Sequence, residues 1–227
     1  MIRVLGVSKK YRTGEETVHA LREVSVSIRT GELAAILGPS GCGKTTLLNV
    51  IGQIVCPDEG SVKIFDTELA FGNDRDAARF RNETFGYLVQ DFALVEQDTV
   101  FQNVRIPLIY SKRKIHSHRQ RVLSALEEFE MGSMVDYLVS DLSGGQRQRV
   151  ALARAIVNEP KIILADEPTG SLDLANKQKV FAYLQGLAHA GRTVVIVTHD
   201  LELAQKCDVV YTLRDGALET NSAASPS

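Results

Sequence analysis

A run of glycines followed by lysine and threonine is the first group of residues whose types and spacing suggest chemistry. The run Gly38-Pro39-Ser40-Gly41-Cys42-Gly43-Lys44-Thr45 fits the P-loop pattern G-x-x-x-x-G-K-[ST], and Thr46 follows it. Glycines let successive backbone N–H groups turn toward an anion, and the following helix adds its N-terminal dipole. Lys44 can place a positive charge beside the β- and γ-phosphates, and the Thr45 hydroxyl can bind Mg²⁺. The alternative is a glycine-rich turn that precedes a helix by chance, and the location between a buried strand and a helix argues against it.

Two carboxylates and a histidine follow the ends of two later apolar runs. Asp166 and Glu167 come after residues 162–165, and His199 comes after residues 192–198. Because side chains alternate along a strand, adjacent carboxylates at its end can take different tasks. Asp166 can hold the Mg²⁺ shell, Glu167 can orient or deprotonate an attacking water, and His199 can contact a γ-phosphate. Alone, these residues would also fit a solvated acidic pair and a structural histidine, but the phosphate loop favours the catalytic interpretation.

The strands and helices that would position these groups follow an α/β pattern. Expected strands cover residues 3–7, 24–28, 32–37, 161–165, 192–198 and 209–213. Expected helices cover residues 44–54, 117–131, 143–157, 175–189 and 201–206, and Asp215-Gly216 predicts a hairpin turn. Residues from about 74 to 140 are mostly polar and helical. The predicted fold is therefore a P-loop NTPase core with a mixed, mainly parallel sheet, an N-terminal antiparallel β subdomain and an inserted helical subdomain.

Length and composition indicate one domain, and the net charge of the chain is not that of a typical nucleic-acid-binding protein. The chain has 227 residues, 44% of them hydrophobic, and a formal net charge of −2, whereas nucleic-acid binders are usually basic. We expect one domain over residues 1–220, with core segments 1–89 and 159–220, a helical subdomain at about 90–158 and a disordered tail at 221–227. Three unpaired cysteines indicate a reducing compartment, and no run approaches the ~20 apolar residues of a membrane span. We therefore expect a cytoplasmic protein that reaches a membrane only by docking.

The segment Leu142-Ser143-Gly144-Gly145-Gln146 narrows the choice among P-loop proteins. It resembles the signature motif of ABC (ATP-binding cassette) ATPases, and a serine hydroxyl, glycine N–H groups and a helix start again form an anion site. In that family the site binds the γ-phosphate of an ATP held by the other subunit. An ordinary capped helix would explain Ser143 but not the paired glycines.

The resemblance covers residues 2 to about 216 and implies roles for further residues. Tyr11 matches the aromatic residue that stacks on adenine, and Val18 matches its apolar neighbour. Gln90 matches the Q-loop glutamine, which contacts Mg²⁺ and senses the membrane partner, and Ser171-Leu172-Asp173 match the D-loop at the dimer interface. The implied cofactors are ATP and Mg²⁺, the implied metal-binding residues are Thr45, Gln90 and Asp166, and the implied assembly is a head-to-tail homodimer around two ATP molecules.

Residues 86–110 and 165–173 are similar to one branch of the family, which contains lipoprotein-release, macrolide-export and antimicrobial-peptide-resistance ATPases. This implies a separate membrane permease driven by mechanotransmission, to which a periplasmic or extracellular accessory protein can be added, and a location on the cytoplasmic face of the membrane. Two alternatives stay open. One is a soluble ABC ATPase acting on DNA or ribosomes, and the other is a regulatory cassette that binds ATP without hydrolysing it.

Overall fold

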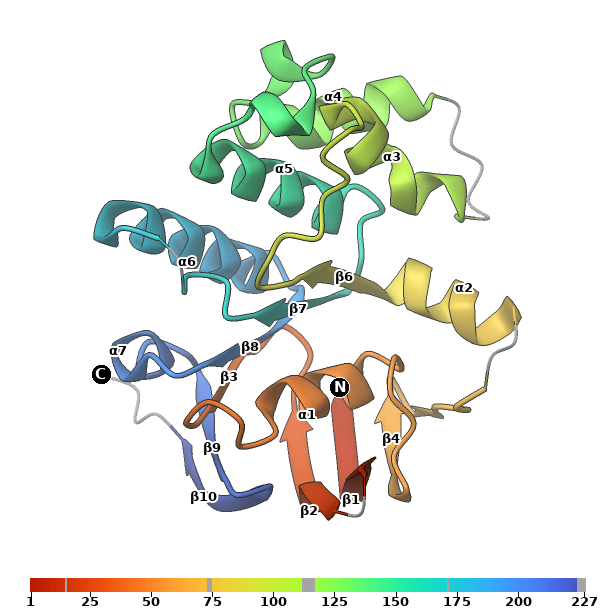
Figure 1. Ribbon diagram of the computed structural model, residues 1–227, viewed down its shortest axis with the longest axis vertical. Coiled ribbons are helices and arrows are strands. Elements are labelled where there is room, and N and C mark those ends of the chain that lie inside the picture. The colour runs from red at the N-terminus through yellow and green to blue at the C-terminus, as the bar shows by residue number, and fades with distance from the viewer. Residues whose placement is uncertain (15, 73–74, 112–116, 171, 224–227) are drawn as a thin grey trace.

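The computed structural model describes residues 1–14, 16–72, 75–111, 117–170 and 172–223 (Figure 1). In these residues two β-sheets enclose helix α1 (Lys44–Ile51), and a layer of helices covers the outer face of the larger sheet. The predicted α/β class, with a mixed sheet, an antiparallel N-terminal sheet and additional helices, is confirmed.

The smaller sheet is entirely antiparallel, with strand order β2-β1-β4-β5. Its strands are β1 (Ile2–Thr13), β2 (Glu16–Ile28), β4 (Glu59–Ile64) and β5 (Thr67–Glu68). The first two strands extend well beyond the predicted 3–7 and 24–28. The alternation of buried and exposed side chains is regular only in the second half of β2, whereas its first residues are exposed on both faces. Alternation therefore detects only the part of the hairpin that packs on the core.

The larger sheet carries the predicted chemistry at the carboxyl ends of its strands. Its strand order is β10-β9-β3-β8-β7-β6, and all neighbouring pairs are parallel except β9 with β10. The strands are β3 (Leu33–Leu37), β6 (Phe85–Leu88), β7 (Ile162–Asp166), β8 (Thr193–Thr198), β9 (Val209–Arg214) and β10 (Ala217–Ala223). Because β3, β7 and β8 are neighbours and point the same way, the residues that follow them meet at one edge of the sheet.

Side-chain alternation divides the core into two clusters on the two faces of this sheet. Ile36, Leu164 and Val195 belong to the cluster that contains α1 and the smaller sheet. Their neighbours Ala35, Ile163 and Val194 belong to the cluster under the helical layer. Burial on both faces explains why these strands read as continuous apolar runs in the sequence.

All but the first of the remaining helices begin after a residue whose side chain accepts a hydrogen bond from the first turn. They are α2 (Arg75–Thr84), α3 (Val100–Ile109), α4 (His118–Glu127), α5 (Gly144–Ile156), α6 (Leu174–His189) and α7 (Leu201–Ala204), with 3₁₀ turns at Gly132–Met134 and Val139–Asp141. Ser117 and Ser143 accept hydrogen bonds from the first turns of α4 and α5, as predicted. Helix α4 ends four residues before the predicted Met131, and Glu130 has a left-handed φ of 58°. Among the described helices, none has both the length and the apolar character needed to cross a bilayer.

The predicted start of the disordered tail, at residue 221, is too early in the chain, because β10 continues to Ala223. Residues Asn221 to Ala223 continue β10 and pair with residues 209–211 of β9. Asp215 and Gly216 have φ values of 48° and 80°, which suit a tight hairpin turn. This turn lets β10 pair with the edge of β9 that does not pair with β3. Residues 224–227 lie outside the described part of the chain.

Candidate nucleotide-binding site

The P-loop connects β3 to α1 with backbone conformations that require glycine. Gly43 caps α1 with a φ of 105°, and a Cβ atom added there would lie 2.2 Å from the carbonyl oxygen of Ala20. Gly41 also has a left-handed φ, of 80°. The loop can therefore direct its N–H groups inward, toward the start of α1, as an anion site requires.

Lys44 lies under this loop and is almost completely buried. Its Nζ atom donates hydrogen bonds to the carbonyl oxygens of Gly38 and Pro39, at 2.8 and 2.9 Å. The same atom lies 3.8 Å from Oε1 of Glu167. A buried ammonium group between the loop and a carboxylate is well placed to exchange carbonyl partners for phosphate oxygens.

A pocket of about 560 Å³ opens beside the loop. It brings together Gly41, Gly43, Lys44, Thr45 and Thr46 with residues of the first hairpin and with Asp215-Gly216. Tyr11 and Val18 both line it, face each other across β1 and β2, and are 40% and 51% exposed. An exposed aromatic ring beside a phosphate loop is the arrangement expected for stacking on a nucleobase. Cys42 is not among the lining residues, because it is buried in the core cluster below the loop.

Thr45 and Asp166 meet although they are far apart in the sequence. The Thr45 hydroxyl donates to Oδ1 of Asp166 at 3.2 Å. Burial raises the pKa of Asp166, and the nearby negative charge of Glu167 adds to this, whereas Thr45 and Lys44 act in the opposite direction. The hydroxyl and carboxylate oxygens are hard ligands of the kind that Mg²⁺ uses, so this pair fits the proposed metal position.

Glu167 and His199 form the second contact at this edge of the sheet. Nδ1 of His199 lies 3.0 Å from Oε1 of Glu167, and the Thr198 hydroxyl donates to Oε2 at 3.4 Å. Glu167 has a left-handed φ of 45°, an unfavourable conformation for a side-chain-bearing residue that is found preferentially at functional sites. The structure thus brings the predicted carboxylate and histidine together.

Two other predicted elements lie apart from this cluster. Gln90 is exposed in the turn after β6, and within the described residues it makes no hydrogen bond to Thr45 or Asp166. Asp173 caps α6 by accepting from the backbone N–H of Asn176 at 2.9 Å, and Leu172 is half-buried. Ser171 lies outside the described residues.

The signature segment forms an exposed helix start away from the pocket. The Ser143 hydroxyl accepts from the Gln146 N–H at 3.4 Å, and Oε1 of Gln146 accepts from the Ser143 N–H at 2.8 Å. Gln146 therefore closes a capping box within the chain. Ser143 and Gly144 are exposed, Gly145 is half-buried, and none of residues 143–146 is among the described residues that line the P-loop pocket.

Sequence reasoning missed several long-range contacts of the same regions. Gln148 donates to the carbonyl oxygen of Pro168 at 2.9 Å. Arg154 donates to the carbonyl oxygens of Phe92 and Ala93, just after Gln90, and the bond to Ala93 is 2.6 Å long. His19 and Arg22 line the P-loop pocket. No local pattern marks these residues, because only folding brings them near their partners or the pocket.

The fold and the site define a P-loop nucleotide-binding protein. Residues 21–170 match the sequence model of the family described as "ABC transporter", and the chain belongs to this family. It is an ABC-type ATPase and binds ATP. It is 41% identical over 224 residues to the ABC transporter ATP-binding protein MJ0796 of Methanocaldococcus jannaschii, covering 96% of this chain and 95% of that protein.

Other relatives and solved structures agree with this family. The ATP-binding protein YvrO of Bacillus subtilis is 42% identical, with 96% and 95% coverage of the two chains. The macrolide export ATP-binding/permease protein MacB of Chlorobaculum tepidum is 38% identical, and the match covers 96% of this chain but 33% of MacB. A dimeric, post-hydrolysis structure of MJ0796 bound to ADP and Pi superposes with a TM-score of 0.92, 38% identity and full coverage of both chains.

Proposed function

We propose that this chain is the ATP-hydrolysing subunit of a transporter, that it closes head to tail around two ATP molecules, and that it drives a separate membrane protein. The observation that carries the dimer is the separation of two anion sites within one chain. The P-loop pocket contains no residue of 143–146, and the exposed helix start at Ser143 is therefore free to contact a phosphate held elsewhere. The MJ0796 structures, which are dimeric, support the formation of a dimer.

In this proposal the predicted site residues divide the work between them. The P-loop and Lys44 bind the β- and γ-phosphates, Tyr11 and Val18 contact the adenine, and Thr45 and Asp166 hold Mg²⁺, which shields phosphate charge during transfer. Glu167 accepts a proton from the attacking water, and His199 orients Glu167 through the 3.0 Å contact. Ser143 with residues 144–146 binds the γ-phosphate from the opposite subunit. Hydrolysis breaks this shared bridge and allows the dimer to open.

The Glu167→Gln variant tests the proposal. The amide keeps the size of the side chain but is not a base, so we expect turnover to fall by about 100-fold or more while ATP still binds. We also expect ATP to convert this variant into a persistent dimer, measured by light scattering with and without ATP. Turnover close to that of the wild type, or a variant that stays monomeric with ATP, would contradict the proposal.

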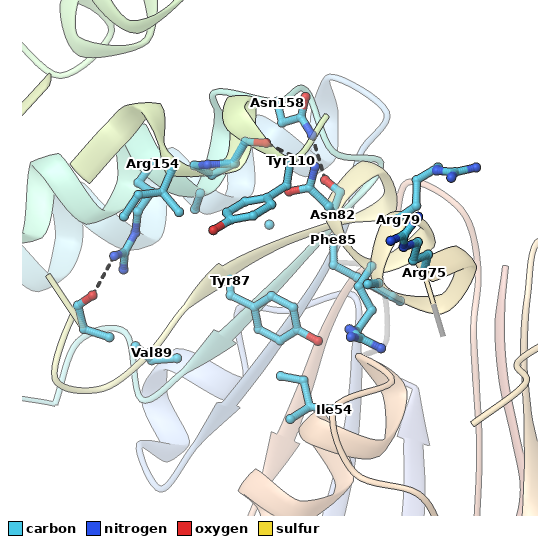
Figure 2. Close-up of a pocket in the computed structure, with 17 residues that line it drawn as sticks. Ile54, Arg75, Arg79, Asn82, Phe85, Tyr87, Val89, Tyr110, Arg154 and Asn158 are labelled. Atoms are coloured by element: carbon cyan, nitrogen blue, oxygen red, sulfur yellow. Dashed lines mark hydrogen bonds between the residues drawn. The ribbon is translucent and has the colours of Figure 1, made fainter. Parts of the chain in front are cut away.

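A second pocket, of about 700 Å³, fits the docking of the membrane partner (Figure 2). It lies between α2, β6, α3 and α5, beside the turn that contains Gln90. Ile54, Phe85, Tyr87 and Tyr110 give it apolar walls, and Figure 2 shows Tyr87 and Tyr110 turned toward its interior. The described lining residues also include four arginines and no carboxylate: Arg75, Arg79, Arg81 and Arg154. A partner segment with an apolar face and a carboxylate would complement this surface.

Arg154 connects the docking pocket to the turn that carries Gln90. It lines the pocket and donates to the carbonyl oxygens of Phe92 and Ala93, whose φ values are 58° and 46°. Burial lowers the pKa of Arg154. A partner that moves the walls of this pocket would therefore also move the residues next to Gln90.

The name of the MacB relatives supports a partner of the export type. We place the chain on the cytoplasmic face of the membrane as part of the same proposal. Cross-linking from Tyr110→Cys, in a Cys56→Ser background, tests for the partner because Tyr110 is 70% exposed at the pocket. We expect a cross-link to a membrane-embedded protein, and none from the control Lys10→Cys on β1. A cross-link to nucleic-acid-binding proteins or ribosomes would favour the soluble alternative. Absence of phosphate release from ATP would favour the non-hydrolysing one.

A further inference from the structure

A buried glutamine connects the signature helix to the segment that carries Glu167. Gln148 lies one turn into α5 and is 2% exposed. Its Nε2 atom donates a 2.9 Å hydrogen bond to the carbonyl oxygen of Pro168. Buried amides of this kind keep their partners, because an unpaired buried carbonyl is costly.

The segment that Gln148 holds is one that needs support. Glu167 has a left-handed φ of 45°, although a residue before proline favours an extended backbone. Its N–H donates to the carbonyl oxygen of Val197 at 3.0 Å, and its own carbonyl accepts from the Gly170 N–H at 3.1 Å. The first bond ties the Glu167 backbone to β8, and the second lies within the turn itself. Among the described residues, Gln148 adds a hydrogen bond to this turn from α5.

The same helix begins at the residue assigned to the second ATP molecule. Gln148 follows Ser143 by five residues, which corresponds to ~7.5 Å along a helix axis. In the head-to-tail dimer, Ser143 would contact the ATP bound by the partner copy, whereas Glu167 would act on the ATP bound by its own chain. In that dimer, a movement of α5 would reach the turn after Glu167 through the hydrogen bond of Gln148.

We propose that Gln148 is a positioning residue that holds the Glu167 turn in its catalytic conformation and couples it to occupation of the other ATP site. The inference rests on the proposed head-to-tail dimer. Because Gln148 touches neither pocket, it acts on the alignment of Glu167 and leaves the P-loop contacts to the nucleotide unchanged. Loss of the Gln148 hydrogen bond should therefore lower kcat and leave the affinity for ATP unchanged.

The test compares two substitutions of Gln148 with a matched control. Gln148→Met keeps the length of the side chain but cannot donate a hydrogen bond. Gln148→Glu has nearly the shape of glutamine and donates only while the introduced carboxyl group is protonated, which burial favours. Gln120→Met is the control, because Gln120 lies exposed on α4, away from both ATP half-sites.

We expect Gln148→Met to lower kcat by about 10-fold with the Kd for ATP within about 2-fold of wild type, as for a lost transition-state interaction. We expect Gln148→Glu to be more active than Gln148→Met at pH 6 and to lose this advantage as the pH rises. Gln120→Met should match the wild type. Unchanged kcat in Gln148→Met, an equal loss of ATP affinity, or no recovery by Gln148→Glu at pH 6 would overturn the inference. A wild-type chain that neither hydrolyses ATP nor dimerises would instead contradict the proposed function.

Discussion

Nδ1 of His199 lies 3.0 Å from Oε1 of Glu167, so the imidazole ring is held by the carboxylate at the end of the neighbouring strand. This contact leaves Nε2 as the ring nitrogen available for a ligand. The side chain of His199 is 61% exposed, whereas that of Glu167 is 12% exposed, so the histidine is the more accessible member of the pair. The pair is thus arranged to present one nitrogen to a phosphate and one oxygen to a water molecule.

Removing this ring should slow hydrolysis more than it weakens ATP binding. We expect His199→Ala to lower kcat by about 100-fold, the usual range for loss of one group that acts in proton transfer or charge stabilisation. Steady-state phosphate release and equilibrium ATP binding measure the two effects. His189→Ala, at an exposed position near the end of α6, is the control and should behave as wild type. Equal losses in the two variants would show that the contact is not used.

The raised pKa of Asp166 predicts that removing the charge of this side chain stabilises the protein and at the same time abolishes its activity. Its ordinary value is 3.8, and burial disfavours the charged form in the folded protein. The folded state then binds more protons than the unfolded state between pH 3.8 and the raised pKa, so the free energy of unfolding falls as the pH rises through this window. Asp166→Asn removes this cost, and we expect a higher Tm than wild type at pH 7.5 together with loss of Mg²⁺-dependent hydrolysis.

Thermal unfolding without nucleotide, repeated at pH 4 and pH 7.5, checks the sign. The difference in Tm between Asp166→Asn and wild type should be smaller at pH 4, where more of the wild-type carboxyl group is protonated. A lower Tm for the variant at pH 7.5 would show that the carboxylate stabilises the fold instead.

Features with local causes could be predicted from the sequence. The P-loop, the helix starts at Ser117 and Ser143 and the turn at Asp215-Gly216 depend on residues within one or two turns of chain. Strands β3, β7 and β8 could be predicted because burial on both faces makes them continuously apolar, whereas β6 and β10 were not among the expected strands. Helix ends were less accurate, since left-handed residues such as Gln53 and Glu130 carry no strong sequence signal.

Contacts between distant residues could not be predicted. The bonds from Gln148 to Pro168, from Arg154 to Ala93 and from Tyr211 to Ser27 span 20, 61 and 184 residues. A glutamine or an arginine on a helix is normally a solvated side chain, so its type alone does not point to a buried partner. The left-handed φ of Glu167 likewise follows from the turn that the whole sheet edge imposes.

The hydroxyl group of Tyr211 links the two sheets and should contribute to stability. It donates to the carbonyl oxygen of Ser27 on β2 at 2.5 Å and accepts from the Ser27 N–H at 3.3 Å, while the ring packs in the core. Tyr211→Phe keeps the ring but leaves both backbone groups without this partner, so we expect a loss of about 1–3 kcal/mol in the free energy of unfolding. Urea denaturation measures it, with Tyr137→Phe at an exposed position as the control. Equal stability of the two variants would show that the link contributes nothing.

The three cysteines should differ sharply in their reactivity. Cys56 is exposed, whereas Cys42 and Cys207 are 6% and 2% exposed. Burial, reinforced by the negative charge of Asp208, raises the pKa of Cys207 to about 12, so almost no reactive thiolate is present at neutral pH. We expect an aromatic disulfide reagent to titrate one thiol rapidly in the native protein and all three in denaturant. The Cys56→Ser variant should lose the rapid phase, and rapid labelling of Cys207 in that variant, identified by peptide mass, would contradict the buried position of this thiol beneath α7.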